Sequence, residues 1–378
     1  GYYPLLADYI ARCCYMLRQG DFVADVAVYS PLANQWTKSA LDARRWTRSF
    51  EWGELGELLI ANGYDFDLVN DDILQNGAEI RDGKIKIRNN AYSFLVVPNI
   101  QAIPLNTLRF IEEYARKGGV VIALERIPTE SVGLLGHEKR DEEVRKMAED
   151  MFAAPRGRDN TGRKRYGEGW TYQITQVMDR TNVLDRRSSV LDPFVNALRE
   201  HLPPDVGIDF VHEGIRRNEG LAFIHRVVDR SDIYFVTNIQ DRPVDTQLTF
   251  RTSKKLPWTY NPYTGDISRI YVYREAEQGI EVPVELASYE STILVFQPGA
   301  DTRSISDTDF SRITEIEEGR AVALADRNGP HSVSVRGTTG DTERRFVVEG
   351  IPAPYTVSGD WTVTFEGRGF DTLTKRMP

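Results

Sequence analysis

The stretch YSFLVVPNIQAIPLNTLRFIEEYARKGGVVIAL, residues 92–124, decides the fold of the N-terminal half of the chain. Its apolar run 92–97 predicts a strand, and 104–117 predicts a helix that begins at a proline and ends at a glycine pair. The apolar run 120–124 predicts a second strand. Because parallel strands need a crossover connection, and a helix supplies one here, this order indicates a parallel β-α-β unit.

The same alternation continues on both sides of this stretch. We expect strands at 23–29 and 66–70 with a helix at 49–62 between them, and a further strand at 166–174. Strands separated by amphipathic helices are typical of a parallel sheet with helices on both faces. The sequence therefore predicts a doubly wound α/β domain over residues 21–207.

The pattern changes near Pro203-Pro204, where short runs of alternating apolar and polar residues replace the helices. Such runs, separated by turn residues, favour an antiparallel β-sandwich over 208–300. A polar run at 301–309 predicts a linker, and 301–378 as a whole is expected to hold that linker and a partial β-sandwich. The expected strands are 221–228, 233–239, 246–251, 270–273, 281–286, 292–296, 321–324, 332–335, 346–348 and 361–365.

The first residues predict a helix that begins at Pro4 and ends at Gly20. Its apolar residues recur with the helical period and form one stripe, which needs a partner surface. We therefore expect residues 1–20 to be the last helix of a domain that precedes Gly1. The stripe consists of Leu5, Leu6, Tyr9, Ile10, Cys13, Met16 and Leu17.

Composition excludes several classes of protein. The 378 residues are 41% hydrophobic, which is too apolar for a disordered chain, and their number predicts two or three domains. We expect no membrane span because no run approaches ~18 apolar residues. The formal net charge of −9 argues against nucleic acid as a partner, since that partner requires concentrated positive charge.

Motifs for catalysis or metal binding are missing from the sequence. The turn at 97–100, where an amidotransferase-type nucleophile would stand, has no cysteine, while Cys13 and Cys14 lie on the first helix. Residues 157–164 lack the Gly-Lys-Ser/Thr ending of a phosphate-binding loop, and His225 lies in an expected strand, where a hydrogen-bonded structural histidine is the default. The acidic group Asp65, Asp67, Asn70, Asp71 and Asp72 is interpreted as helix capping rather than a metal site. No catalytic residue, metal ligand or cofactor site is assigned.

A loop rich in tryptophan and arginine supplies the candidate substrate-binding residues Trp36, Arg45, Trp46 and Trp52. The loop follows the first expected strand, at the edge where α/β sheets bind ligands. Indole faces can pack on the apolar face of a sugar ring, and arginine can bond to its hydroxyls. The commoner role of such rings is burial in an interdomain contact, and this alternative stays open.

Short strings along nearly the whole chain resemble, in matching order, glycoside hydrolase family 106, which contains α-L-rhamnosidases. No string is specific alone, and Asn261 stands where the family usually has Asp. The strings are DYIARC (8–13), LRQG (17–20), VADV (23–26), NGYDFD (62–67), LVVP (95–98), KGGV (117–120), YFVTN (234–238), WTYNPYTG (258–265) and GDWTVTF (359–365).

The resemblance implies a larger sugar hydrolase whose catalytic carboxylates lie on a (β/α)₈ barrel upstream of Gly1. It implies that the parent inverts stereochemistry, can use calcium and is a bacterial periplasmic or extracellular protein acting on carbohydrate. It makes residues 1–20 the last helix of that barrel, and makes 359–365 the start of a jelly-roll-like domain. The α/β domain also resembles the amidotransferase-like domain of β-galactosidases, which has no chemistry of its own. By this interpretation the chain alone is inactive.

Two other functions stay open. The chain could be a non-catalytic carbohydrate-binding or assembly module that acts through the aromatic loop. It could also be a complete hydrolase with a site at the switch point of the α/β sheet, near Pro98 and Asn70.

Overall fold

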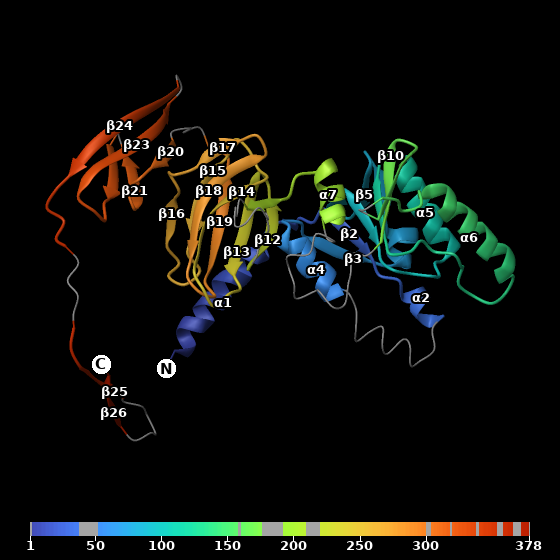
Figure 1. The fold of residues 1–378 in the computed structure, drawn as a ribbon, viewed down its shortest axis with the longest axis horizontal. Coiled ribbons are helices and arrows are strands. Elements are labelled where there is room, and N and C mark those ends of the chain that lie inside the picture. Colours follow the sequence, from blue (N-terminus) through green and yellow to red (C-terminus); the bar gives the residue numbers. More distant parts are fainter. Residues whose placement is uncertain are drawn as a thin grey trace.

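The computed structural model describes residues 2–37, 52–157, 160–175, 192–208, 220–299, 304–317, 320–337, 340–353, 358–365 and 372–377. It is a mixed α/β protein with many antiparallel sheets, as the sequence predicts. Figure 1 shows a parallel sheet with helices at one end, two antiparallel sheets in the middle and smaller sheets at the other end. None of the helices in the described ranges is long and apolar enough to cross a membrane.

The N-terminal half forms a six-stranded sheet with the order β3-β2-β7-β8-β10-β9. The first five strands are parallel, and β9 pairs with β10 in the antiparallel direction at the edge. We call this sheet and its helices the parallel unit. Its strands are β2 (Val26–Tyr29), β3 (Phe66–Val69), β7 (Phe94–Val97), β8 (Val120–Leu124), β9 (Thr161–Tyr166) and β10 (Gly169–Ile174).

Helices cover both faces of this sheet. Residues of α4 and α7 pack on one face and residues of α5 and α6 on the other, so β2, β7 and β8 are buried along their whole length. Such burial requires the continuous apolar runs that the sequence shows. The remaining elements are α2 (Leu32–Trp36), α4 (Trp52–Ala61), the π-helix η1 (Ile73–Gly77), β4 (Glu79–Arg81), β5 (Lys84–Ile87), β6 (Asn90–Tyr92), α5 (Leu105–Arg116), α6 (His137–Met151) and α7 (Asp192–His201).

Two antiparallel sheets follow, with the orders β1-β12-β13-β19-β15-β16 and β11-β14-β18-β17. We call them together the antiparallel unit. Their apolar faces share one core, in which the rings of Tyr234, Phe250 and Phe296 meet with centroids 4.8–5.7 Å apart. The strands are β1 (Asp21–Phe22), β11 (Val206–Ile208), β12 (Leu221–Val228), β13 (Ser231–Asn238), β14 (Val244–Phe250), β15 (Leu256–Tyr260), β16 (Ile267–Arg269), β17 (Arg274–Ala276), β18 (Gly279–Leu286) and β19 (Ser291–Gln297).

The C-terminal residues form three small antiparallel sheets, β20-β23-β24, β21-β22 and β25-β26. Ile305 joins the first of them to the antiparallel unit, since its backbone pairs with the backbone on either side of Val272. The strands are β20 (Ser304–Thr308), β21 (Arg312–Glu317), β22 (Arg320–Leu324), β23 (Gly329–Gly337), β24 (Gly340–Val348), β25 (Trp361–Phe365) and β26 (Leu373–Met377).

The strand expected at 166–174 is confirmed at 169–174 as β10, but its start differs, because Tyr166 ends β9 and the turn between the two strands has Gly167 at φ +62°, close to Arg116. Two other local predictions are wrong. The expected strand 270–273 lies between β16 and β17, and the expected linker 301–309 contains strand β20. A polar composition misled the linker prediction, since an edge strand can be polar on its exposed face.

Helix α1 (Tyr3–Leu17) lies against the outer face of the six-stranded antiparallel sheet (Figure 1). Met16 packs there on Ile233, Ile293 and Val295. Tyr9 shares a 2.8 Å hydrogen bond with the Ser291 hydroxyl. Three residues of its apolar stripe stay in solvent, namely Leu5, Leu6 and Ile10, together with Tyr2, Tyr3 and Tyr15 beside them.

Candidate functional site

The carboxyl edge of the parallel sheet is the candidate site that the topology defines. Of the strands in this sheet, β2 comes first in the chain. The connection from β2 leads to β3 on one side of it, and the next connection leads to β7 on its other side, so the switch in direction lies between β2 and β7. In parallel α/β sheets, ligands bind in the crevice at such a switch point. The residues that follow these strands therefore line the candidate site.

Asp71, just beyond β3, is a carboxylate at this edge that accepts two short hydrogen bonds. Its Oδ1 accepts hydrogen bonds from the Tyr29 hydroxyl at 2.7 Å and from the Thr107 hydroxyl at 2.6 Å. Burial and the neighbouring Asp71 carboxylate both raise the pKa of Tyr29, so the phenol stays protonated and keeps donating. Asp71 is thus held as an acceptor that links the end of β2 to α5.

Asn34 links the segments that follow β2 and β7 at this edge. Its side chain on α2 is 1% exposed, and its Oδ1 accepts from the backbone N–H groups of Gln101 at 3.2 Å and Ala102 at 3.0 Å. Near Pro98, therefore, this side chain ties α2 to the loop that follows β7. Asn70 caps the turn after β3 through a 2.9 Å bond from the Ile73 N–H.

The predicted substrate-binding residues fall in and around a segment that is only partly described. Trp36 is the last residue of α2 and is 81% exposed, so its ring is free to meet a ligand. Trp52 is the first residue of α4. Arg45 and Trp46 lie outside the described residues, so the grouping of the four residues stays a prediction.

The acidic group at 65–72 is distributed among separate partners. Asp67 accepts from the Tyr92 hydroxyl at 2.6 Å, Asp72 accepts from Asn76 at 2.8 Å, and Asp65 accepts from the Phe66 N–H at 2.8 Å. Within the described residues, no group of three or more His, Cys, Asp or Glu side chains is placed to bind a metal ion.

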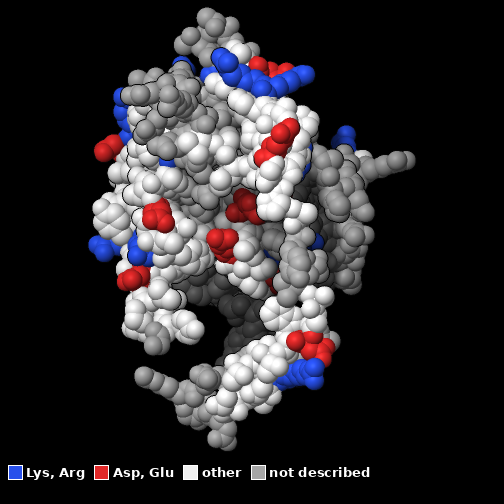
Figure 2. Space-filling model, turned by 90° about the vertical axis from the view of Figure 1, so that its left-hand side faces the viewer, with Lys and Arg blue, Asp and Glu red and all other residues white. Residues whose placement is uncertain are grey.

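Figure 2 shows the charged residues on one face of the molecule. Asp and Glu side chains lie near the middle of this face, and Lys and Arg lie toward its rim. The described residues of this face form no continuous basic surface of the kind that nucleic acid needs.

The sequence did not reveal a buried polar cluster between the two units. His225 bonds to Asp205 and Asp232, and Arg251 bonds to Asp25. Residues this far apart in the chain leave no local signal of contact, although an internal histidine in an apolar strand predicts a hydrogen-bonding partner.

Comparison with solved structures finds a protein with a similar fold. A rhamnosidase from Novosphingobium sp. PP1Y has the same fold over 87% of this chain, with a TM-score of 0.55 and 18% sequence identity. This chain corresponds to 30% of that protein.

Sequence comparison defines the family. The profile of glycoside hydrolase family 106, alpha-L-rhamnosidase, matches residues 2–275, and the chain belongs to this family. A protein of Formosa agariphila, named provisionally as a beta-glucuronidase, is 26% identical over 301 residues. That alignment covers 79% of this chain and 21% of the Formosa protein, so the chain spans about a fifth to a third of the relatives it matches.

Proposed function

We propose that this chain is the non-catalytic part of a glycoside hydrolase that cleaves terminal rhamnosyl or related linkages. The catalytic barrel would precede it in the parent protein. Family membership over residues 2–275 carries this proposal. The bonding at the sheet edge supports it, because Asp71 and Asn34 are occupied in holding the edge together.

The exposed face of α1 favours a barrel as the neighbour of this chain. Tyr3, Leu6 and Ile10 present an apolar surface to water, and exposed patches of this kind mark interaction sites. In the parent, this face would pack on the barrel while Tyr9 and Met16 hold the helix to the antiparallel unit. The finer fold assignments, an amidotransferase-like doubly wound domain and a jelly-roll-like C-terminal domain, belong to this proposal.

An activity assay tests where catalysis lies. The 378-residue chain and the full parent protein are each incubated with 4-nitrophenyl α-L-rhamnoside, and circular dichroism verifies that the chain is folded. We expect release of nitrophenol by the parent alone. Cleavage by the folded chain would place the catalytic site within these residues and overturn the proposal.

The gene itself offers a second test. We expect the DNA before the codon of Gly1 to encode alternating strands and helices of a barrel. A start codon within a few codons of Gly1 would contradict the proposed parent.

A second proposed role, carbohydrate binding by the aromatic loop, is favoured by the exposure of Trp36. We propose that Trp36, Arg45, Trp46 and Trp52 form a sugar-binding surface at the carboxyl edge of the sheet. An 81% exposed indole loses apolar hydration when it stacks on a sugar, which makes it a suitable platform.

Affinity electrophoresis in a rhamnose-containing polysaccharide tests this surface. Trp36→Ala should weaken retardation of the chain several-fold without changing its melting temperature. Leu135→Ala is the control, since Leu135 is a comparably exposed apolar residue on the same unit. Equal retardation of both variants and the wild type would exclude Trp36 from sugar binding.

A further inference from the structure

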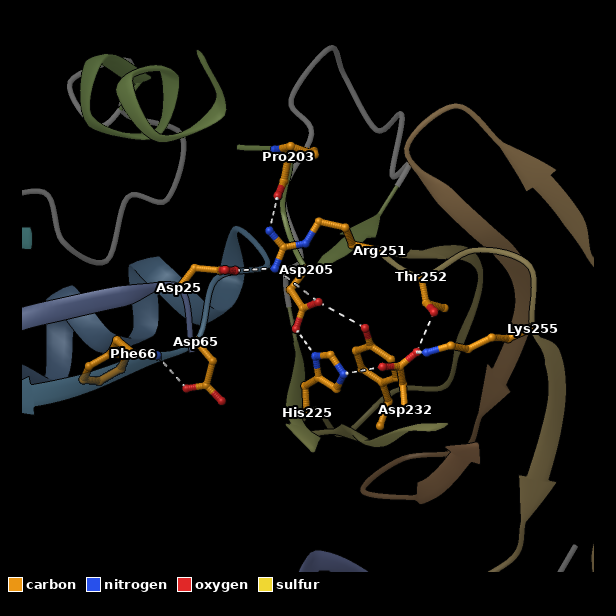
Figure 3. A network of polar contacts seen from close by, with 11 residues as sticks. Asp25, Asp65, Phe66, Pro203, Asp205, His225, Asp232, Arg251, Thr252 and Lys255 are labelled. Carbon is orange, nitrogen blue, oxygen red and sulfur yellow. Dashed lines mark hydrogen bonds and ion pairs between the residues drawn. The ribbon is translucent and has the colours of Figure 1, made fainter. Parts of the chain in front are cut away.

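The contact between the parallel and antiparallel units contains a chain of buried charges, drawn in Figure 3. Asp25 lies just before β2 in the parallel unit, and Arg251 follows β14 in the antiparallel unit. The Arg251 Nη2 atom is 2.5 Å from Asp25 Oδ2 and 3.5 Å from Asp205 Oδ1. The guanidinium of Arg251, from the antiparallel unit, thus binds both Asp25 of the parallel unit and Asp205 of the segment between the units.

The chain continues into the antiparallel unit through His225 on β12. Its Nδ1 is 2.8 Å from Asp205 Oδ2, and its Nε2 is 3.4 Å from Asp232 Oδ1. Asp232 Oδ2 in turn lies 2.5 Å from the Lys255 ammonium. The ring of Tyr234 stacks on the imidazole with centroids 4.0 Å apart.

Two features of this geometry call for a protonated imidazole. Both ring nitrogens face carboxylate oxygens, and a neutral imidazole can donate from one nitrogen only. The charges agree, since Asp25, Asp205 and Asp232 carry three negative charges against two permanent positive charges on Arg251 and Lys255. A charged His225 brings this cluster to neutrality, which matters because buried unbalanced charge is costly.

We propose that this cluster is a proton-sensitive joint that holds the antiparallel unit against the parallel unit, with His225 as the group that titrates. Asp25 is fixed on one side, since its carbonyl accepts from the N–H groups of Ser93 and Phe94. Asp205, in the segment between the units, is fixed to both of them, since its N–H donates to the carbonyl of Gly63 at 2.8 Å and its carbonyl accepts from the Arg251 N–H at 2.9 Å. Loss of the imidazolium charge would leave Asp205 and Asp232 facing each other across a neutral ring.

The direction of the pH effect follows from the surroundings of His225. Burial lowers its pKa, but the carboxylates of Asp205 and Asp232 more than offset this and raise the pKa to about 9. A raised histidine pKa stabilises the native state fully below the ordinary value near 6.5, and this stabilisation is lost as the pH rises through 9.

Asp65 acts in the same direction from the parallel unit. Its burial raises its pKa to about 7, so the native state loses stability as the pH rises from 3.8 through 7 and the carboxyl group ionises. Tyr234 does not titrate in this range, because burial and Asp205 raise its pKa well above 10. Burial raises the pKa of Asp232, but its bonds to His225, Lys255 and Thr252 outweigh this and lower the pKa, so the stability contributed by its charge is lost only in acid. The joint is therefore tightest at mildly acidic pH.

Urea unfolding of the full chain from pH 6 to 9.5 tests the titrating group. Between pH 6.5 and 9 the native state should bind about one proton more than the unfolded state, so the free energy of unfolding should fall as the pH rises. His225→Gln should remove this slope between pH 8 and 9, above the pKa of about 7 of Asp65, and His137→Gln should keep it because His137 is exposed on α6. A slope that survives in His225→Gln between pH 8 and 9 would overturn the proposal.

Nitrogen NMR of the wild type measures the protonation of the imidazoles directly, so the proposal can be tested even if His225→Gln folds poorly. At pH 8, one of the five imidazoles should show both ring nitrogens protonated and should titrate near pH 9. If every imidazole is neutral at pH 8, His225 is not the charged centre of a joint.

A third measurement separates a joint from a merely local stabiliser. Labelling with 5-fluorotryptophan reports Trp170 of the parallel unit and Trp258 of the antiparallel unit separately during urea unfolding. The two midpoints should coincide at pH 6 and separate at pH 9.5. Midpoints that coincide at both values, or that already differ at pH 6, would show that the cluster does not couple the units.

Discussion

At the scale of single residues, Asn34 does more for the candidate site than its exposed neighbours. Its amide oxygen is the hydrogen-bond partner of the N–H groups of Gln101 and Ala102, and all three groups lie at the carboxyl edge of the sheet. A buried donor that loses its acceptor costs far more than an average hydrogen bond contributes. The link between the segments that follow β2 and β7 therefore depends on this side chain.

Asn34→Ala should lower the free energy of unfolding by about 1–3 kcal/mol, because it removes the acceptor of the buried Ala102 N–H. Asn76→Ala removes an amide of the same size at an exposed position and should change stability by less than about 0.5 kcal/mol. Urea denaturation of both variants gives the comparison. Equal stabilities would mean that water replaces the Asn34 oxygen.

Gly63 permits the close approach of the two units. It has φ +81°, and a Cβ atom added there would lie 2.0 Å from the carbonyl oxygen of Val206 on β11. Gly63→Ala should therefore destabilise the chain by at least about 2 kcal/mol through backbone strain and the clash. Gly77→Ala is the matched control, since nothing lies within 4 Å of its added Cβ. Similar melting temperatures for the two variants would contradict so close an approach of Gly63 to β11.

At the scale of elements, the parallel strands could be predicted because short, entirely apolar sequences fit few structures other than a strand buried on both faces. Residues 94–97 and 120–124 are apolar throughout, and strands buried on both faces require such runs. The hairpin of β9 and β10 could not be placed from periodicity, because the turn depends on how Gly167 meets Arg116. The boundary errors thus lie where tertiary contact fixes the backbone.

Helix α1 also shows that a local sequence pattern does not predict tertiary contacts. Its amphipathic pattern predicted the helix and the need for a partner, but not that one face would meet the antiparallel sheet. The contact joins Tyr9 to Ser291, 282 positions away. No local pattern encodes such a pairing, and for the same reason the sequence could not reveal that Asp25 meets Arg251.

The two faces of α1 should respond differently to substitution. Met16→Ala removes a half-buried contact with Ile233 and Ile293, and should lower the free energy of unfolding by about 1–2 kcal/mol. Leu6→Glu changes an exposed side chain and should leave the stability of this chain unchanged within about 0.5 kcal/mol. In the parent protein, Leu6→Glu should instead lower the melting temperature, if the proposed barrel covers this face. A loss of stability from Leu6→Glu in this chain alone would show that Leu6 already packs within it.

At the scale of the whole molecule, the question is whether the units act as one body. The ion pair of Asp25 and Arg251 bridges them, and both side chains are largely removed from solvent. Salt screens such a pair less than a surface pair, so its effect should persist at physiological ionic strength. Because Arg251 also contacts Asp205, removal of the guanidinium would disturb the cluster around His225 as well.

A double-mutant cycle with Asp25→Asn and Arg251→Gln measures this coupling. Each single variant should cost about 3–5 kcal/mol, because it leaves one buried charge without its partner. The double variant should cost clearly less than the sum, which gives a coupling energy above about 1 kcal/mol. The surface pair of Arg109 and Glu143 provides the control cycle, where solvent limits the coupling to less than about 1 kcal/mol. Additive costs for Asp25 and Arg251 would mean that the two units touch without stabilising each other, and the joint would then have no energetic basis.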